Sequence, residues 1–175
     1  MTGTKYSLDT ILMWKHIPKA GELLLLSGTI YTARDAAHKL LLRDLESNSP
    51  LPFPLEASAI YYCGPTPSRG ITIGSCGPTT SYRMDPYTPT LLSHGVACTI
   101  GKGDRGNEVY DAIIEHNAIY LAAIGGCGAL YAECVLSSEE IAYPELGCES
   151  IKRLTIRDFP VYVAIDSRGK SIYRK

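Results

Sequence analysis

The chain has 175 residues, of which 45% are hydrophobic and 20% charged, enough for one soluble domain with a hydrophobic core. Its formal net charge of -1 argues against a nucleic-acid-binding protein and against a basic membrane-binding face. The longest uncharged apolar run, residues 117–131, contains three glycines and is too short to predict a transmembrane helix. The N-terminus lacks the basic-then-apolar order of a signal peptide, so we expect a cytoplasmic protein.

The N-terminal part contains one predicted strand and one predicted helix. Residues 22–28 form an apolar run that predicts a buried strand. Residues 32–35 resemble a capping box, which predicts a helix that continues to residue 45. The proline-rich residues 47–54 predict a surface crossing within one domain, because the part before them is too small to fold alone.

Short strands and short helices alternate through the rest of the chain. Strands are predicted at residues 58–63, 70–75, 96–100 and 118–124. Helices are predicted at residues 88–95, 107–117 and 128–136. Residues 161–170 predict a final hairpin. We therefore expect a single compact α/β domain that spans residues 1–175, in an order of strands that the local pattern leaves open.

Three turns share one design, in which an apolar strand is followed by glycine and then by a basic residue. They span residues 28–34, 74–83 and 101–103, and they carry Arg34, Arg83 and Lys102. In α/β proteins, ligands collect at the loops after strands, where glycine lets the backbone approach closely. If the three turns bring these cations together, they form a suitable binding site for a small dicarboxylate. The alternative is three unrelated surface cations.

Residues 77–85 combine a Gly-Pro turn with two threonines, a serine and an arginine. If a helix starts at Thr79, Arg83 lies one turn later on the same face, and a hydroxyl and a guanidinium point at one ligand. The alternative is a capped helix with a surface arginine, although capping needs only one of the hydroxyls. His38 follows Arg34 by one helical turn, so we expect it either to border the same site or to be a structural histidine.

The six cysteines include no CxxC or CxxxC pair, the spacing at which one turn presents two thiolates to a metal. We therefore expect buried, reduced cysteines and no metal site formed by this chain alone. Residues 101–106 match GxGxxG, which makes nucleotide binding an alternative. It is a minor one, because the acidic residue that a dinucleotide site needs about 20 residues later is missing.

Residues 27–39 (SGTIYTARDAAHK) resemble the opening motif of the β-type domain of class I fumarases and L(+)-tartrate dehydratases. Residues 77–84 (GPTTSYRM) resemble the second signature of that family, and residues 101–103 (GKG) resemble its third. Residues 144–147 and 158–166 are similar to its C-terminal segments. These motifs occur in order and with comparable spacing over nearly the whole chain.

The resemblance implies a swivelling β/β/α domain that moves as a unit against its partner domain. It also implies a [4Fe-4S] cluster whose three cysteine ligands belong to an α-type domain, so that no cofactor is expected on this chain alone. Because the sequence starts just before the β-type domain, it resembles a β subunit that works with a separate, cluster-bearing α subunit. An isolated β chain is expected to be able to pair with itself through the surface that normally meets the α subunit.

The family's residue roles carry over to matching positions. Arg34, Arg83 and Lys102 match its substrate-carboxylate contacts, and Thr79 matches the threonine proposed as the base at C3 of malate. Gly77 and Thr80, in the same motif as Thr79, are expected at the border of the site. The resemblance implies that the unligated iron of the cluster acts as a Lewis acid on the substrate's hydroxyl and a carboxylate. Arg83 and Lys102 would stabilise the threonine alkoxide.

The implied activity is that of a hydro-lyase, with the reversible hydration of fumarate to malate in the tricarboxylic acid cycle as the first expectation. Ser81 and Tyr82 stand where many fumarases have Ala-Gly, so dehydration of L(+)-tartrate is the alternative. A different class of protein, a non-catalytic module that binds a small anion or another protein, also fits a basic pocket. Only the enzyme requires a cluster-bearing partner.

Overall fold

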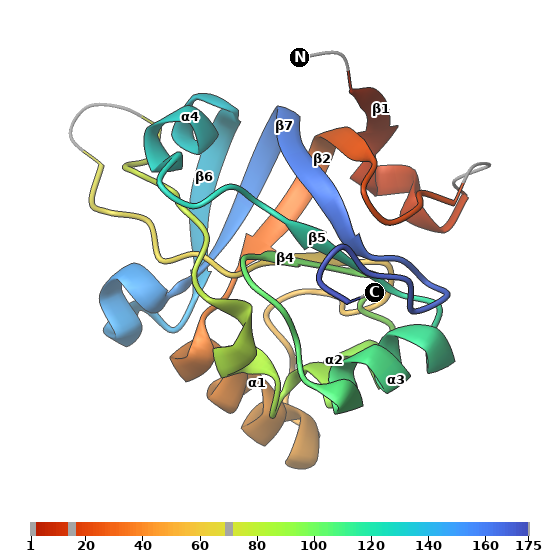
Figure 1. Cartoon of the computed structure of the whole chain (residues 1–175). Coiled ribbons are helices and arrows are strands. Elements are labelled where there is room, and N and C mark those ends of the chain that lie inside the picture. Colours follow the sequence, from red (N-terminus) through yellow and green to blue (C-terminus); the bar gives the residue numbers. More distant parts are fainter. Residues whose placement is uncertain (1–2, 14–16, 69–71, 175) are drawn as a thin grey trace.

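The computed structural model describes residues 3–13, 17–68 and 72–174 (Figure 1). Its strands are β1 (Thr4–Ser7), β2 (Leu23–Thr32), β3 (Ala59–Tyr61), β4 (Cys98–Gly101), β5 (Ile119–Ala122), β6 (Val135–Ala142) and β7 (Ile151–Ile165). Its α-helices are α1 (Asp35–Glu46), α2 (Thr88–Ser93), α3 (Asn107–Glu115) and α4 (Gly128–Glu133). Three short 3₁₀ segments are η1 (Leu8–Met13), η2 (Ser81–Met84) and η3 (Pro144–Glu149).

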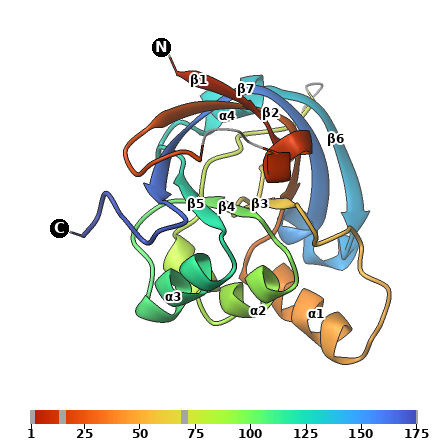
Figure 2. The same cartoon turned by 90° about the vertical axis from the view of Figure 1, so that its right-hand side faces the viewer.

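Five strands close into a ring. The sheet order is β1-β2-β3-β4-β5-β7-β6, and β2 also pairs with β7, so that β2, β3, β4, β5 and β7 form a closed circuit. Strands β2 to β5 run parallel to one another, and β7 runs antiparallel to both β2 and β5. The two remaining strands lie outside the circuit, β1 beside β2 and β6 beside β7. Figure 2 shows the ring with the helices α1, α2 and α3 below it.

Two hydrophobic clusters lie on the two sides of the ring strands. One cluster takes alternate residues of the ring strands, such as Leu26, Tyr61, Leu121 and Phe159, and fills the interior of the ring. The other packs the opposite faces of β3 and β5 against α1, α2 and α3, which lie side by side beneath the ring (Figures 1 and 2). Because successive residues of a strand point to opposite faces, a strand covered on both faces is apolar throughout. This double burial explains the continuous apolar runs of β3 and β5.

The predicted mixed α/β class and most of the predicted elements are confirmed. Strands occur within or overlapping the predicted ranges 22–28, 58–63, 96–100 and 118–124, and α2 and α3 match the predicted helices within two residues. The described residues contain no helix that is both long enough and apolar enough to cross a membrane.

The predicted capping box at residues 32–35 is wrong. Thr32 is the last residue of β2, and Arg34 precedes α1 without a side-chain capping bond. The Thr32 hydroxyl donates to the Ser150 carbonyl at 3.4 Å and accepts the Lys152 amide at 3.0 Å. The Thr32 hydroxyl, predicted to cap the helix, is therefore occupied by contacts with Ser150 and with β7 instead.

Three further element predictions need correction. In the predicted strand at 70–75, residues 70 and 71 lie outside the described residues, residues 72–74 form bends, and residue 75 belongs to no strand. The helix predicted at 128–136 ends at Glu133, because β6 begins at Val135 and pairs with β7. The C-terminal turn is confirmed by a bridge between Ile165 and Ser171, but its first strand is the 15-residue β7 rather than a short hairpin arm.

Candidate active site

The residues singled out by the three glycine turns gather at the carboxyl ends of the parallel strands. Arg34 follows β2, the segment with Thr79 and Arg83 follows β3, and Lys102 follows β4. Gly125 belongs to the loop that follows β5. Because parallel strands end at the same edge of a sheet, loops that are distant in sequence meet there.

Thr79 and Thr80 lie across the ends of β3 and β4. The Thr79 amide donates to the Tyr62 carbonyl at 2.7 Å, and Thr80 forms a parallel bridge with Lys102. The Ser81 amide continues this pairing with a 2.9 Å hydrogen bond to the Lys102 carbonyl. Gly101 is required for this approach, because a Cβ at that position would overlap the Ser81 hydroxyl. Thr79, Thr80 and Lys102 are thereby held side by side.

Thr79 does not start a helix, contrary to the sequence-based hypothesis. The 3₁₀ turn η2 begins at Ser81, and Thr80 before it is extended because it pairs with Lys102. Thr79 and Arg83 are therefore not aligned by one helical turn. The Thr79 side chain is half-buried, and its hydroxyl makes no hydrogen bond to any residue in the described part of the chain. Gly77 packs against the start of α4, where its added Cβ would be 3.5 Å from the Gly128 Cα.

Arg34 and Arg83 come together through carboxylates that sequence reasoning missed. Arg83 Nη2 lies 2.6 Å from Asp35 Oδ2, and Arg34 Nε lies 3.9 Å from Asp35 Oδ1. Arg34 Nη2 also lies 3.1 Å from Glu149 Oε1, at the end of η3. Asp35 was visible in the sequence only as a helix-capping candidate next to Arg34. Glu149 gave no local signal, because it is brought to Arg34 by the return of the chain from β6 to β7.

The arginines lower the pKa of Asp35. Partial burial alone raises it, but the hydrogen bond from Arg83, a backbone hydrogen bond and the charges of Arg83 and Arg34 together outweigh that effect. The carboxylate is therefore ionised at neutral pH and orients both guanidinium groups. The two arginines are thereby joined through one shared carboxylate, and Glu149 also contacts Arg34.

Lys102 is the more available cation. Its side chain is half-buried, and its ammonium group has no hydrogen-bond or ion-pair partner among the described residues. A Cβ built on Gly125 would lie 3.9 Å from Lys102 Nζ, which places the ammonium group beside the loop after β5. An anion that reaches this loop can contact Lys102 without displacing a carboxylate of the described chain.

His38 lies behind Arg34 and is fully buried within α1. Its Nδ1 is 2.8 Å from the Arg34 carbonyl oxygen, and its ring packs against Tyr62 and Tyr87. Its Nε2 has no hydrogen-bond partner in the described part of the chain. Burial is the main cause that lowers the pKa of His38, to about 4. This environment fits a neutral structural histidine that supports Arg34 from beneath.

Acidification should therefore destabilise the fold through His38. The unfolded chain takes up a proton on this residue near its ordinary pKa of 6.5, whereas the folded chain does so only near 4. Stability from this group is present above pH 6.5 and is lost as the pH falls towards 4, by roughly 3 kcal/mol. Urea denaturation across this range should show a smaller loss for His38→Phe, which keeps the ring contacts. An equal loss in both proteins would exclude His38 as the linked group.

The cysteines do not form a ligand set. Cys63, Cys76 and Cys98 are buried as expected, but Cys127 and Cys134 are only partly buried. Cys148 is exposed, so the expectation of burial is wrong for that residue. Cys63 Sγ lies 3.1 Å from Cys76 Sγ, and the neighbouring thiol and burial raise the pKa of Cys63. The described residues contain no group of three or more His, Cys, Asp or Glu side chains that could hold a metal. The thiols seen here therefore do not fit an iron–sulfur cluster.

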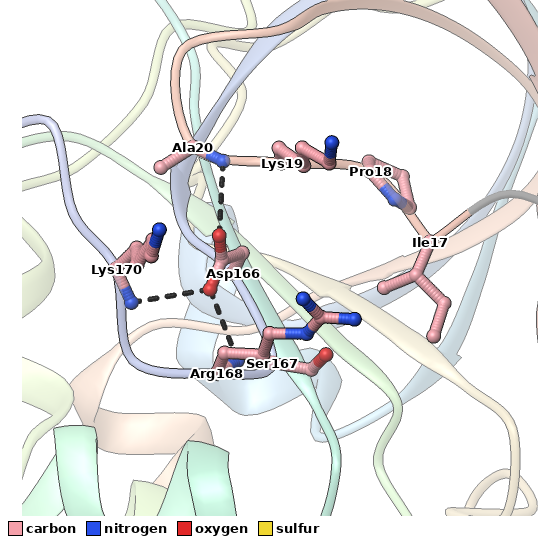
Figure 3. Close-up of a pocket in the computed structure, with 8 residues that line it drawn as sticks. All are labelled: Ile17, Pro18, Lys19, Ala20, Asp166, Ser167, Arg168 and Lys170. Atoms are coloured by element: carbon pink, nitrogen blue, oxygen red, sulfur yellow. Dashed lines mark hydrogen bonds between the residues drawn. The ribbon is translucent and has the colours of Figure 1, made fainter.

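A hollow of about 310 Å³ lies at the opposite end of the parallel strands (Figure 3). Lys19, Arg168 and Lys170 surround it, and its buried carboxylate, Asp166, accepts hydrogen bonds from the amides of Ala20, Arg168 and Lys170. None of the residues predicted for the site lines this hollow. The candidate site is instead at the carboxyl ends of β2 to β5, where Thr79 directly precedes the residue that pairs with Lys102.

Comparison with known proteins gives a consistent set of matches. The family model described as Fumarase C-terminus matches residues 5–175. Fumarate hydratase 2 of Leishmania major is 38% identical over 158 residues, and the anaerobic class I fumarate hydratase of Escherichia coli K12 is 40% identical over 156 residues. These alignments cover 89% and 87% of this chain but only 28% of each relative. A putative L(+)-tartrate dehydratase subunit beta of Methanocaldococcus jannaschii is 38% identical, with 90% of this chain and 84% of that subunit covered.

Proposed function

The chain belongs to the Fumarase C-terminus family, and on that basis we propose that it supplies one half of the active site of a hydro-lyase. The observation that carries this proposal is the convergence of Arg34, Arg83, Lys102 and Thr79 at the carboxyl ends of the parallel strands. The proposed reaction is the reversible addition of water to fumarate to give malate.

The arrangement suits a substrate with two carboxylates. We assign one carboxylate to Lys102, whose ammonium group has no partner among the described residues, and the other to the patch formed by Arg34 and Arg83. In this arrangement, a substrate carboxylate replaces part of the interaction between Asp35 and Arg83. Each hydrogen bond between a charged donor and a carboxylate contributes about 1.5–3 kcal/mol, so these contacts account for orientation as well as affinity.

Thr79 is the proposed base at C3 of malate. A neutral threonine is a weak base, and it can act only if neighbouring cations stabilise its alkoxide. The pairing of Thr80 with Lys102 holds Thr79 close to the lysine-bearing turn and supports this assignment. His38 is too buried to exchange protons with a substrate, and we assign it no chemical step.

We assign the [4Fe-4S] cluster to a partner α subunit. The match over 84% of a tartrate dehydratase subunit beta supports a two-subunit arrangement, and the thiols of the described residues do not form a cluster site. In this arrangement residues 1–175 form one β-type domain of the swivelling β/β/α type, which moves as a body against the α subunit. Its free thiols favour the reducing cytoplasm as its location.

Tartrate is the second candidate substrate, favoured by the similarity to the tartrate dehydratase subunit. Of the two residues that differ from the Ala-Gly of many fumarases, Ser81 is buried and its hydroxyl lies 2.8 Å from the Tyr120 hydroxyl. Tyr82 is 67% exposed, beside Arg83. We therefore attribute any difference in substrate preference to Tyr82 rather than to Ser81.

The test is an anaerobic assay of fumarate hydration, followed by the loss of fumarate absorbance. It compares this chain alone, the cluster-bearing partner alone, and their complex. We expect activity only in the complex, and a parallel assay with L(+)-tartrate identifies the preferred substrate. A formed complex with an intact cluster and no activity on either substrate would contradict the proposal and favour a non-catalytic module that binds small anions.

A further inference from the structure

Arg105 is a buried cation that has no part in the function proposed above. Its side chain is only 2% exposed, and its guanidinium group lies against the rings of Tyr62 and Tyr120, with centroids at 5.4 and 4.8 Å. Its Nε donates to Asp85 Oδ1 at 2.6 Å, and its Nη2 donates to the Thr88 hydroxyl at 2.7 Å. A buried charge with so many directed contacts holds its neighbours in one arrangement.

These contacts join the two segments that carry the proposed substrate cations. Arg105 lies shortly after Lys102, and Asp85 lies shortly after Arg83. The other oxygen of Asp85, Oδ2, accepts the Gly106 amide at 2.6 Å. Both oxygens of one carboxylate on the Arg83 segment are therefore held by the turn that carries Lys102.

The same two segments are joined at their other end. Thr80 pairs with Lys102, and the Tyr120 hydroxyl lies 2.8 Å from both the Ser81 hydroxyl and the Gly103 carbonyl. Between these two attachments the Arg83 segment has one 3₁₀ turn and no strand of its own. The direction of Arg83 therefore depends on contacts with residues 101–106.

We propose that Arg105 and Asp85 are positioning residues that set the placement of Arg83 relative to Lys102. The proposal rests on the proposed function, in which these two cations bind the substrate carboxylates. A buried ion pair adds little net stability compared with apolar residues, but its directed hydrogen bonds select one conformation. In this proposal Arg105 makes no contact with the substrate and influences Arg83 by holding the Asp85 carboxylate.

The decisive variant changes both members of the pair. Removing only one partner would leave an unpaired buried charge and strongly destabilise the fold. That destabilisation would hide any local effect on Arg83. The double variant Arg105→Met/Asp85→Asn removes both charges, and it keeps an acceptor for the Gly106 amide. The matched control is Arg153→Met/Glu139→Gln, which removes an exposed ion pair of 2.5 Å between β7 and β6 that has no contact with Arg105 or Asp85.

The first measurement is amide hydrogen exchange in the full chain without partner, so its result does not depend on activity. We expect the Ser81 amide, which donates to Lys102, to exchange about tenfold faster or more in the double variant. The Ile119 amide, which donates to Ala97 at the far end of β5, should be unchanged. Unchanged Ser81 exchange, or equal acceleration at Ile119, would overturn the positioning role.

The second measurement is steady-state kinetics of the complex with the cluster-bearing partner. We expect KM for the dicarboxylate to rise about tenfold in the double variant, as for one misaligned charged hydrogen bond, and to stay unchanged in the control. Loss of folded protein with a normal KM would reduce Arg105 to a structural role and overturn the proposal. Inactivity of the unmodified complex would instead reject the proposed function, and the exchange experiment would still decide the role of Arg105.

Discussion

Replacing Thr79 with alanine is expected to lower kcat for fumarate hydration by about 10²–10⁴-fold, the range contributed by a positioned acid or base. The variant keeps the amide of residue 79, which bonds to the Tyr62 carbonyl, so the segment should stay in place. Because Arg83 and Lys102 are unchanged, KM should change little. The measurement is anaerobic kinetics of the assembled complex, with cluster content checked in each preparation.

Two controls separate loss of the base from a local disturbance. Thr80→Ala removes the neighbouring, exposed hydroxyl and should retain most of the activity, and Thr79→Ser keeps a hydroxyl at the reacting position. Solvent-isotope exchange at C3 of malate reports the proton transfer directly. Undiminished exchange in Thr79→Ala would eliminate Thr79 as the base, even if overall turnover fell.

Replacing Phe159 with alanine is expected to lower the free energy of unfolding by about 3–5 kcal/mol. Phe159 is fully buried inside the ring of strands, and its ring centroid lies 5.2 Å from that of Tyr61 and 4.5 Å from that of Tyr131. The cavity left by the missing phenyl group cannot collapse easily, because each surrounding strand is paired on both sides. Chemical denaturation measures this loss.

Tyr162→Ala on the same strand is the matched control. Tyr162 points outwards and is 36% exposed, so its loss should cost about 1 kcal/mol or less. Equal destabilisation by the two substitutions would contradict the assignment of Phe159 to the interior of the ring.

The sequence by itself determined the elements with a strong local pattern and supplied the candidate residues for the proposed site. The apolar runs that contain β3 and β5 are readable because strands buried on both faces are apolar throughout. Glycine followed by a basic residue marked Arg34, Arg83 and Lys102, because close backbone approach and a charged side chain are both local properties. The motifs around these turns resembled a known family, and the family match over residues 5–175 confirms that resemblance.

Only the tertiary structure decided how these pieces are joined. Thr32 does not cap α1, because its hydroxyl accepts a hydrogen bond from the Lys152 amide in β7. The predicted last helix is shorter than expected, because its last residues belong to β6, which pairs with β7. Three ion pairs join segments that are far apart in the sequence, so no local sequence pattern predicts them. They are Glu149–Arg34, Asp35–Arg83 and Asp85–Arg105. The physical reason is that closure of the ring through β2 and β7 sets the relative positions of loops that are far apart in sequence, whereas periodicity and turn chemistry describe only a few neighbouring residues.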